Sequence, residues 1–422
     1  MLKKTWVIAA TVLFSSALVT APATAADTVA RPCPQLRLSA GWYGGNAGKI
    51  QRVIDERGRC GGHRGARPVA VFDWDNTVVK NDTSDQTIFW MLRHDKVLQP
   101  RGADWRTTSR YMTDAGANAL HDACGTDVKP GAPLPTSRNV RCADELLSVR
   151  KNAKTTAGAE VFDGTHNHRY MEASYAWVAQ LNAGYRPSEV RAIAAAARLD
   201  ALRAPIGATQ RVGSHTETAW IRYYPQIKDL IRTLGKAGFE TWVVSASPRE
   251  TAEVWAAGVG VPPSRTIGIT SLTTNGRFNG HLAGCGGIAD GEDAIMPYID
   301  GKRCFINKTV LGIEGAAQLD QAPEARRQAL AGGDATTDIT MLGDATGVRI
   351  ALNRNKDELM CRAYDNADGK WAVNPMFIQP LPALARTYPC STAAYENADG
   401  SHAPVRRADG TVIPDQRDTV HG

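Results

Sequence analysis

The sequence has no Cys-x-x-Cys pair, no run of eighteen apolar residues and no block of basic residues with interleaved aromatics. The missing cysteine spacing argues against a zinc or dithiol redox site. Without a long apolar run, no membrane-spanning helix is expected. The net charge of +6 is modest for 422 residues and comes without a basic block, so no nucleic-acid partner is expected.

The N-terminus has the pattern of a secretory signal covering residues 1–26. Lys3 and Lys4 form a basic start, residues 6–19 are mostly apolar, and Ala23-Thr24-Ala25 is a small-residue cleavage pattern. The apolar run is too short to cross a membrane. We therefore predict export, with cleavage near Ala25, and a secreted, extracellular or periplasmic protein.

Eight cysteines are an even number, and in an exported chain an even number favours disulfides. Eight cysteines allow 105 pairings, so the spacing alone does not give the connectivity. Because each adjacent pair falls inside one region of the sequence, we expect neighbour to pair with neighbour. The cysteines are Cys33, Cys60, Cys124, Cys142, Cys285, Cys304, Cys361 and Cys390.

An apolar run at Val69-Ala70-Val71-Phe72 leads directly into Asp73 and Asp75. A continuous apolar run is typical of a parallel strand buried on both faces, and chemistry in such sheets lies beyond the strands' carboxyl ends. Two carboxylates at one strand tip repel each other, and a divalent cation relieves that repulsion. The alternative is a strand followed by an ordinary Asp/Asn-rich turn.

The chain divides into an interrupted α/β core and a helical insertion. Helical patterns dominate residues 97–222, a segment too long for a loop. Alternating helices and strands follow, including strands at 241–244, 266–269, 329–332 and 348–352, a hairpin at 272–282 and a helix at 308–320. We predict an N-terminal arm (27–67), core (68–96), helical cap insertion (97–222), core (223–390) and a disordered polar tail (391–422).

Polar residues follow further predicted strands. Ser245 ends the strand at 241–244, and Gly333-Asp334-Ala335-Thr336-Thr337-Asp338 follows the strand at 329–332; Lys302 comes after a glycine-rich stretch. Each alone has an ordinary structural reading, as a strand-end cap, a turn or a surface lysine. Together with Asp73-x-Asp75-x-Thr77 they resemble the four motifs of the haloacid dehalogenase-like hydrolases, in particular their phosphoserine-phosphatase-like and phosphorylcholine-phosphatase-like members. The resemblance covers about residues 68–95 and 223–360.

The resemblance implies a doubly wound, Rossmann-like parallel-sheet core and a role for each motif. Asp73 is the expected nucleophile, forming an aspartyl-phosphate, and Asp75 the general acid and base. Ser245 and Lys302 are expected to bind the phosphoryl group. Lys308 is a second candidate for the lysine.

The resemblance also implies a metal site. Its expected ligands are Asp73, Asp75, Asp334 and Asp338, with Asp338 acting through water or by orienting its neighbours. All-oxygen ligation favours Mg²⁺ over zinc. Asp344 also follows a glycine but lies beyond the Met341-Leu342 turn that suits the family pattern.

The expected activity is that of an exported, Mg²⁺-dependent phosphomonoesterase acting on a small ester such as phosphocholine, phosphoserine or a sugar phosphate. An acid at Asp75 distinguishes such a phosphatase from the dehalogenases of the superfamily. Transfer to an acceptor other than water, and an inactive phospho-ligand-binding protein, are the alternatives. Aromatic residues of the insertion suit either a cage for a quaternary ammonium group or helix packing. His166 and His168 suit a second metal site or a polar loop.

Overall fold

The computed structural model describes residues 1–3, 5–6, 32–61 and 65–421. Most of the predicted signal, including Lys4 and the cleavage site near Ala25, lies outside these residues. The helices are α1 (Asn46–Arg57), α2 (Thr83–Arg93), α3 (Asp114–Cys124), α4 (Val140–Asn152), α5 (Ala173–Gln180), α6 (Pro187–Arg203), α7 (Pro225–Lys236), α8 (Arg249–Ala256), α9 (Asp300–Thr309), α10 (Ile339–Asp344) and α11 (Asp357–Asp365). The strands are β1 (Val69–Phe72), β2 (Val79–Lys80), β3 (Thr209–Val212), β4 (His215–Thr218), β5 (Arg222–Tyr223), β6 (Glu240–Pro248), β7 (Thr266–Ile269), β8 (Ser271–Thr274), β9 (Arg277–Leu282), β10 (Leu330–Gly333), β11 (Val348–Asn353), β12 (Trp371–Pro375), β13 (Tyr395–Glu396) and β14 (His402–Ala403).

Six of the strands form one parallel sheet in the order β12-β11-β10-β1-β6-β7. The chain builds outward from β1 in one direction through β6 and β7, then returns to the other side of β1 through β10, β11 and β12. The reversal leaves a crevice at the carboxyl ends of β1 and β10, where ligands bind in open sheets of this kind. This is the predicted doubly wound, Rossmann-like core.

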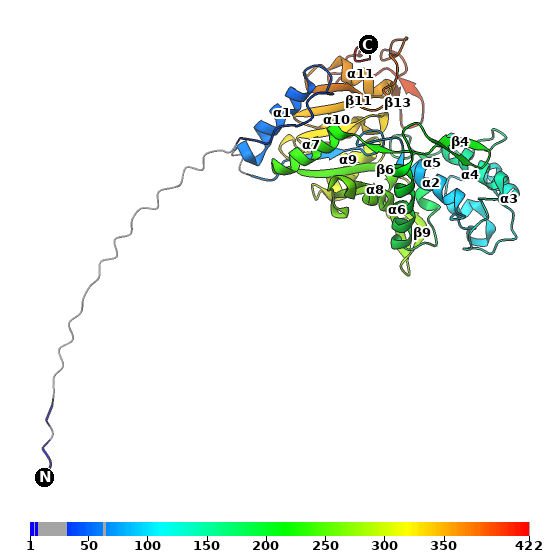
Figure 1. The fold of residues 1–422 in the computed structure, drawn as a ribbon, viewed down its shortest axis with the longest axis horizontal. Helices are drawn as coiled ribbons and strands as arrows, with labels where there is room; N and C mark the ends of the chain where they lie inside the picture. The colour runs from blue at the N-terminus through cyan, green and yellow to red at the C-terminus, as the bar shows by residue number, and fades with distance from the viewer. Residues whose placement is uncertain (4, 7–31, 62–64, 422) are drawn as a thin grey trace.

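Helices cover both faces of the sheet (Figure 1). Side chains alternate along each strand, so Phe72 of β1 packs with α1, α7 and α8 on one face. Val71 packs with α9, α10 and α11 on the other. Burial on both faces explains why β1 reads as a continuous apolar run.

The helical insertion leaves the core through β2 and returns through β5, which pair antiparallel with each other. Beyond this two-stranded base, α2 to α6 contribute most of a second apolar cluster, which Ile269, Leu282 and Met296 of the core complete. Figure 1 shows α2, α3, α4 and α5 to one side of the sheet. The β8–β9 hairpin has the predicted turn, with Asn275 and Gly276 at positive φ values of 53° and 74°.

The prediction of a helix at residues 308–320 is wrong. Instead, α9 begins at Asp300 and ends at Thr309, and only a short 3-10 helix, Gly315–Leu319, follows. Gly312 and Gly315 adopt φ values of 61° and 62°, a left-handed conformation that interrupts a helix. Lys302 lies in the first turn of α9.

The C-terminal segment, predicted to be a disordered tail (391–422), is ordered through residue 421. It contains the β13–β14 hairpin and buries Val405 and Ile413 in the apolar cluster of the core. These apolar residues are too widely spaced in a polar segment to produce a strand or helix pattern. The Cys361–Cys390 disulfide ties the start of this segment to α11.

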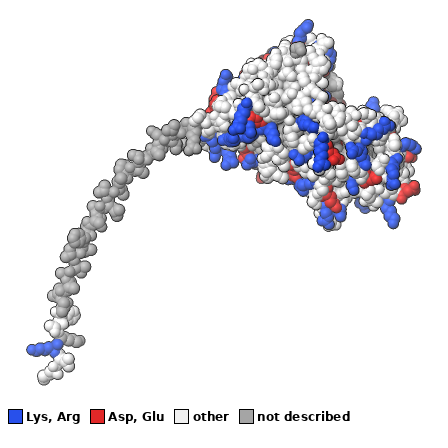
Figure 2. Space-filling model, in the orientation of Figure 1, with Lys and Arg blue, Asp and Glu red and all other residues white. Residues whose placement is uncertain are grey.

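The predicted neighbour pairing of the cysteines is confirmed. The disulfides are Cys33–Cys60, Cys124–Cys142, Cys285–Cys304 and Cys361–Cys390. Among the described residues, none of the helices has both the length and the apolar character needed to span a bilayer. On the face shown in Figure 2, basic and acidic side chains are interspersed over the insertion and the lower part of the core.

Candidate active site

Asp73 occupies the position directly after β1, where its backbone N–H donates to Gly332 O of the neighbouring β10 at 2.9 Å. The following turn passes through Asn76 with φ 61°, a left-handed conformation that asparagine tolerates. This turn brings Thr77 Oγ1 within 3.0 Å of Asp73 Oδ2 and 2.6 Å of Asp334 Oδ1. Thr77 therefore links the ends of β1 and β10.

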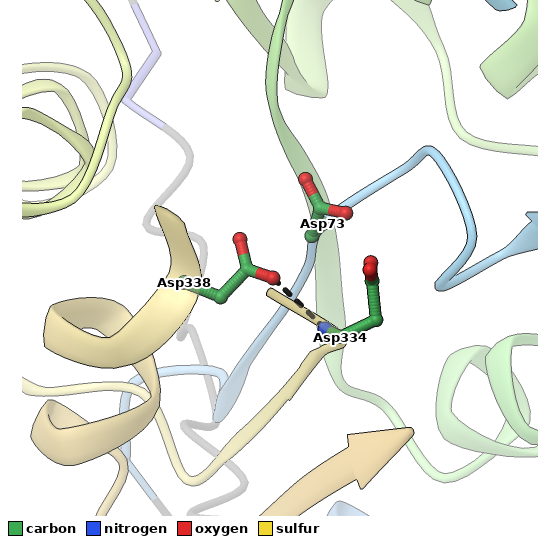
Figure 3. A group of neighbouring side chains, drawn as sticks. All are labelled: Asp73, Asp334 and Asp338. Atoms are coloured by element: carbon green, nitrogen blue, oxygen red, sulfur yellow. Dashed lines mark hydrogen bonds between the residues drawn. The ribbon is translucent and has the colours of Figure 1, made fainter. Parts of the chain in front are cut away.

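Three buried carboxylates converge at this point. One oxygen from each of Asp73, Asp334 and Asp338 lies within 4.8 Å of the others. The side chains point toward one another in Figure 3, which also shows the Asp334 N–H donating to Asp338 Oδ2 at 2.8 Å. A side chain at Gly333 would place Cβ only 2.6 Å from Asp338 Cβ, so this approach requires glycine. The cluster is the only group of this kind among residues 32–61 and 65–421.

Lys302 supplies one positive charge to this cluster. Its Nζ donates to Asp73 Oδ1 and to Asp338 Oδ1, both at 2.6 Å, and its side chain is completely buried. Lys308, the second candidate, donates instead to Gly284 O at 2.8 Å. The geometry therefore favours Lys302 as the lysine of the motif.

Burial and charge crowding shape the electrostatics of the site. Burial, reinforced by the negative charge of Asp338, raises the pKa of Asp73 well above its ordinary value, although Lys302 opposes this. Burial also raises the pKa of Asp334. Burial alone would lower the pKa of Lys302, but the two carboxylates it contacts raise it above its ordinary value. Three carboxylates facing one ammonium group leave an excess of negative charge that a divalent cation would balance.

Asp75 differs from Asp73 in its environment. Its Oδ1 accepts from Thr83 N–H at 2.6 Å and its Oδ2 from Ser247 Oγ at 2.7 Å. Burial, together with the negative charge of Asp82, raises the pKa of Asp75 to about 8. Asp75, also predicted as a metal ligand, is not part of the three-carboxylate cluster. Its two oxygens accept from the first residue of α2 and from β6.

Ser245 lies in β6, as its position after the predicted strand suggested, and is almost fully buried. Its Oγ accepts from the Ser247 backbone N–H at 3.1 Å. Ser247, whose hydroxyl contacts Asp75, was not among the residues predicted from the sequence. Because side chains alternate along a strand, the Ser-Ala-Ser pattern indicated that Ser247 shares the face of Ser245.

Arg354 is a second residue that the sequence analysis missed. It follows β11, the strand beside β10, and its Nη1 donates to Asp334 Oδ2 at 2.6 Å. The strand at 348–352 was predicted, and the same rule that selected Asp73 and Ser245, a polar residue at a parallel strand's carboxyl end, applies to Arg354.

A cavity of about 480 Å³ lies between the core and the insertion, and Ser245, Lys302 and Asp338 lie behind its lining residues. The core contributes Asp73, Asp75, Asn76, Ala246, Ser247, Asp334, Ala335, Thr336, Thr337, Arg354 and Lys356, and the segment ahead of α9 contributes Tyr298. The other wall consists of Asp82, Ser84, Asp85, Arg150, Lys151, Tyr175 and Val178, with Glu396 from the C-terminal segment. The site is thus assembled from distant parts of the chain.

Most of the aromatic residues considered for a cage pack elsewhere. Trp105 and Trp177 are buried in the apolar cluster of the insertion. Tyr175 does line the cavity, with the Arg150 guanidinium 4.6 Å from its ring centroid. The rings of His166 and His168 stack at 4.4 Å, apart from the carboxylate cluster. Asp344 pairs with Arg303 and is not part of the cluster.

Residues 154–343 match the family model of the haloacid dehalogenase-like hydrolases. The match includes Ser245, Lys302, Asp334 and Asp338, and begins after the turn that carries Asp73. A solved structure of a functionally unknown protein from Anaerococcus prevotii aligns with a TM-score of 0.57 at 17% identity, covering 80% of this chain and 96% of that one, and thus shares its fold.

Two further solved structures align more loosely. A protein of unknown function from Bordetella pertussis has a TM-score of 0.43 at 18% identity, covering 74% of this chain and all of its own. A substrate-bound phosphoserine phosphatase has a TM-score of 0.32 at 13% identity, covering 68% of this chain and 87% of its own. Among curated proteins, no match was found.

Proposed function

Because the chain is a member of the haloacid dehalogenase-like hydrolases, we propose that it hydrolyses small phosphate monoesters through an aspartyl-phosphate, with Mg²⁺ as cofactor. The observation that supports this most directly is that two aspartates of one turn line the same cavity with different partners. Asp73 is held by Lys302, and Asp75 by Ser247. Two carboxyl groups in different environments suit a nucleophile and a proton donor.

In the first step, a carboxylate oxygen of Asp73 attacks phosphorus while the bond from phosphorus to the ester oxygen breaks. Asp75, whose raised pKa keeps its proton near neutral pH, gives that proton to the departing oxygen. In the second step, Asp75 takes a proton from a water molecule that attacks the aspartyl-phosphate. Inorganic phosphate leaves, and both aspartates return to their initial states.

The remaining polar groups bind the phosphoryl oxygens. Lys302 counters the negative charge that gathers on Asp73 and phosphorus during the attack. Ser245 and Ser247 supply hydroxyl groups at the end of β6, and Arg354 adds a second cation. Ser247 and Arg354 line the cavity, and Lys302 contacts the cavity residue Asp73.

The donor set of the carboxylate cluster fits Mg²⁺. The oxygens of Asp73, Asp334 and Asp338 lie within 4.8 Å of one another, and only carboxylates are present, the ligands that hard cations prefer. In this proposal Asp73 and Asp334 hold the ion, and Asp338 orients them through its bonds to Lys302 and to the Asp334 backbone. When bound, the cation neutralises charge on the phosphoryl group and on the carboxylates.

The insertion is proposed to act as a cap that selects the substrate. It forms one wall of the 480 Å³ cavity, a volume suited to a small phosphorylated substrate such as phosphocholine, phosphoserine or a sugar phosphate. The proposed location is extracellular or periplasmic. Four disulfides, which persist in oxidising compartments, support export.

A phosphate-release screen over many monoesters, with and without Mg²⁺, tests the proposal. Hydrolysis that requires Mg²⁺ and disappears in Asp73→Ala is expected. Retained activity in that variant would overturn the nucleophile assignment, because the covalent step has no substitute. Adding a competing alcohol separates hydrolysis from phosphoryl transfer, and failure on every ester would leave only a binding role.

A further inference from the structure

Arg169, a residue of the insertion just before α5, reaches into the core. Its guanidinium donates to both carboxylate oxygens of Asp300, from Nε at 2.7 Å and from Nη2 at 3.3 Å. Its Nη1 donates to Glu396 O of the C-terminal segment at 3.0 Å and lies 3.5 Å from the buried Glu358. The side chain itself is largely buried. Figure 1 shows α5 on the side of the insertion next to β6 of the core.

Asp300 is the first residue of α9, the helix that carries Lys302. The residue before it, Ile299, is fully buried and has φ 42° and ψ −103°. A β-branched residue at positive φ is strained, and such a conformation persists only where surrounding contacts enforce it. The start of α9 is therefore a place where the backbone needs an external restraint.

The contacts of Asp300 supply that restraint. Besides the two bonds from Arg169, Asp300 accepts a hydrogen bond from the Thr340 hydroxyl in α10. The carboxylate also lies at the N-terminal end of the helix, where negative charge is favourable. Two residues further on, Lys302 must place one Nζ within 2.6 Å of both Asp73 and Asp338.

We propose that Arg169 is a positioning residue: by pairing with Asp300 it fixes the start of α9, so that Lys302 stays directed at Asp73 and Asp338. This proposal rests on the proposed phosphoryl-transfer function for its kinetic consequences. Its geometric content does not depend on that function. It also gives the insertion a role in the chemistry besides substrate selection, since a residue outside the core determines where the catalytic ammonium group lies.

The effect should appear in turnover more than in substrate binding. A displacement of about 1 Å at a catalytic group costs up to about 100-fold in rate. We therefore expect Arg169→Gln to lower kcat for p-nitrophenyl phosphate by about 10- to 100-fold, with KM changed less than about 3-fold. Arg169→Lys keeps a cation near Asp300 and should recover part of the loss.

Asp300→Ala separates this role from the other contacts of Arg169. It removes the pair while leaving the bonds from Arg169 to Glu396 O and toward Glu358 in place, so its kcat should fall as in Arg169→Gln. The double variant should lose less than the product of the two single losses, because the Arg169–Asp300 pair is broken in both single variants. If Asp300→Ala matches the wild type while Arg169→Gln is slow, the proposal is wrong.

Arg407→Gln is the matched control. Arg407 also forms a two-bonded pair, with Asp365 of α11 at 2.9 and 2.5 Å, and its remaining side-chain hydrogen bond goes to Thr411 of the C-terminal segment. Its kcat should stay within about 2-fold of the wild type. An equal loss in this variant would indicate general destabilisation and overturn a specific role for Arg169. Melting temperatures identify variants that fail to fold, and Arg169→Lys then carries the test.

Crystal structures of the variants provide a readout independent of activity. In Arg169→Gln and Asp300→Ala, Lys302 Nζ should lie more than about 3.5 Å from Asp73 Oδ1, beyond hydrogen-bond distance. An unchanged Lys302 would overturn the positioning role even if the variants were slow. If the wild type hydrolyses no monoester, the proposed function fails, and this structural measurement still decides the positioning role.

Discussion

Lys302 Nζ lies 2.6 Å from Asp73 Oδ1, and both side chains are shielded from solvent. The two residues come from different elements, α9 and the turn after β1, separated by 229 residues in the sequence. An ion pair in such a setting carries a large desolvation cost, so its retention is better explained by chemistry than by stability. The first two predictions test that chemistry at Lys302 and at the neighbouring Asp75.

Replacing Lys302 should reduce turnover far more than replacing Lys308. Lys302→Met removes the ammonium group that is bound to Asp73, and we expect kcat for p-nitrophenyl phosphate to fall by about 100- to 1,000-fold. Lys308→Met, on the same helix, loses only a bond to Gly284 O and should stay within about 3-fold of the wild type. Greater damage from the Lys308 change would contradict the assignment.

Asp75→Asn should make the enzyme sensitive to the leaving group. Without a proton donor, alkyl phosphates should be hydrolysed about 100- to 10,000-fold more slowly. Since p-nitrophenolate leaves without protonation, p-nitrophenyl phosphate should still phosphorylate Asp73. Stopped-flow measurements should then show a burst of p-nitrophenol, followed by slow turnover because no base activates the water. Absence of the burst, with phosphorylation by p-nitrophenyl phosphate slowed as much as phosphorylation by alkyl phosphates, would argue against acid catalysis by Asp75.

Asp334→Asn should weaken Mg²⁺ binding, because it removes one negative charge from the carboxylate cluster. Calorimetric titration should show at least about a 10-fold loss in affinity. In the wild type, Mg²⁺ at about 100 times its Kd should raise the free energy of unfolding by about 2.7 kcal/mol. Asp344→Asn is the control, since Asp344 also follows a glycine but pairs with Arg303. An unchanged Mg²⁺ affinity in Asp334→Asn would show that Asp334 is not a metal ligand.

Ser247→Ala should move the alkaline limb of the pH–rate profile. Burial raises the pKa of Asp75 to about 8, so the acid form is lost, and kcat/KM for an alkyl phosphate falls, as pH rises through that value. The hydrogen bond from Ser247 Oγ favours the ionised form and lowers this pKa. Removing the hydroxyl should therefore shift the limb to higher pH. A shift to lower pH would show that Ser247 does not act on Asp75 in this way.

The core of the fold was predictable because its signals are local. The apolar run of β1, the strand before Ser245 and the Asn275-Gly276 turn each follow from a few consecutive residues. The first and last motifs were found because parallel strands place polar side chains at one edge of the sheet. The order of the four motifs along the sequence then indicated the family resemblance, and that resemblance assigned a role to each motif.

What the sequence did not reveal depends on contacts between distant segments. The hydroxyl of Ser247 acquires its role only where β6 meets the Asp75 turn, and Arg354 only where β11 lies beside β10. The C-terminal segment carries too few apolar residues for a local pattern, yet Val405 and Ile413 complete a cluster built mainly by other elements. In the sequence alone, these polar and isolated apolar residues cannot be distinguished from exposed loop residues, because the segments that they contact are not known.

The four disulfides join cysteines only 18 to 29 residues apart. None of them connects the insertion to the core, so each covalent loop closes within a single stretch of newly made chain. Both cysteines of each pair precede the first cysteine of the next pair in the sequence, so oxidation in chain order would give these four bonds. Most of the other possible connectivities would join cysteines that lie much farther apart in the sequence. Local pairing thus gives the polypeptide a direct route to its correct covalent form, without prior assembly of the sheet.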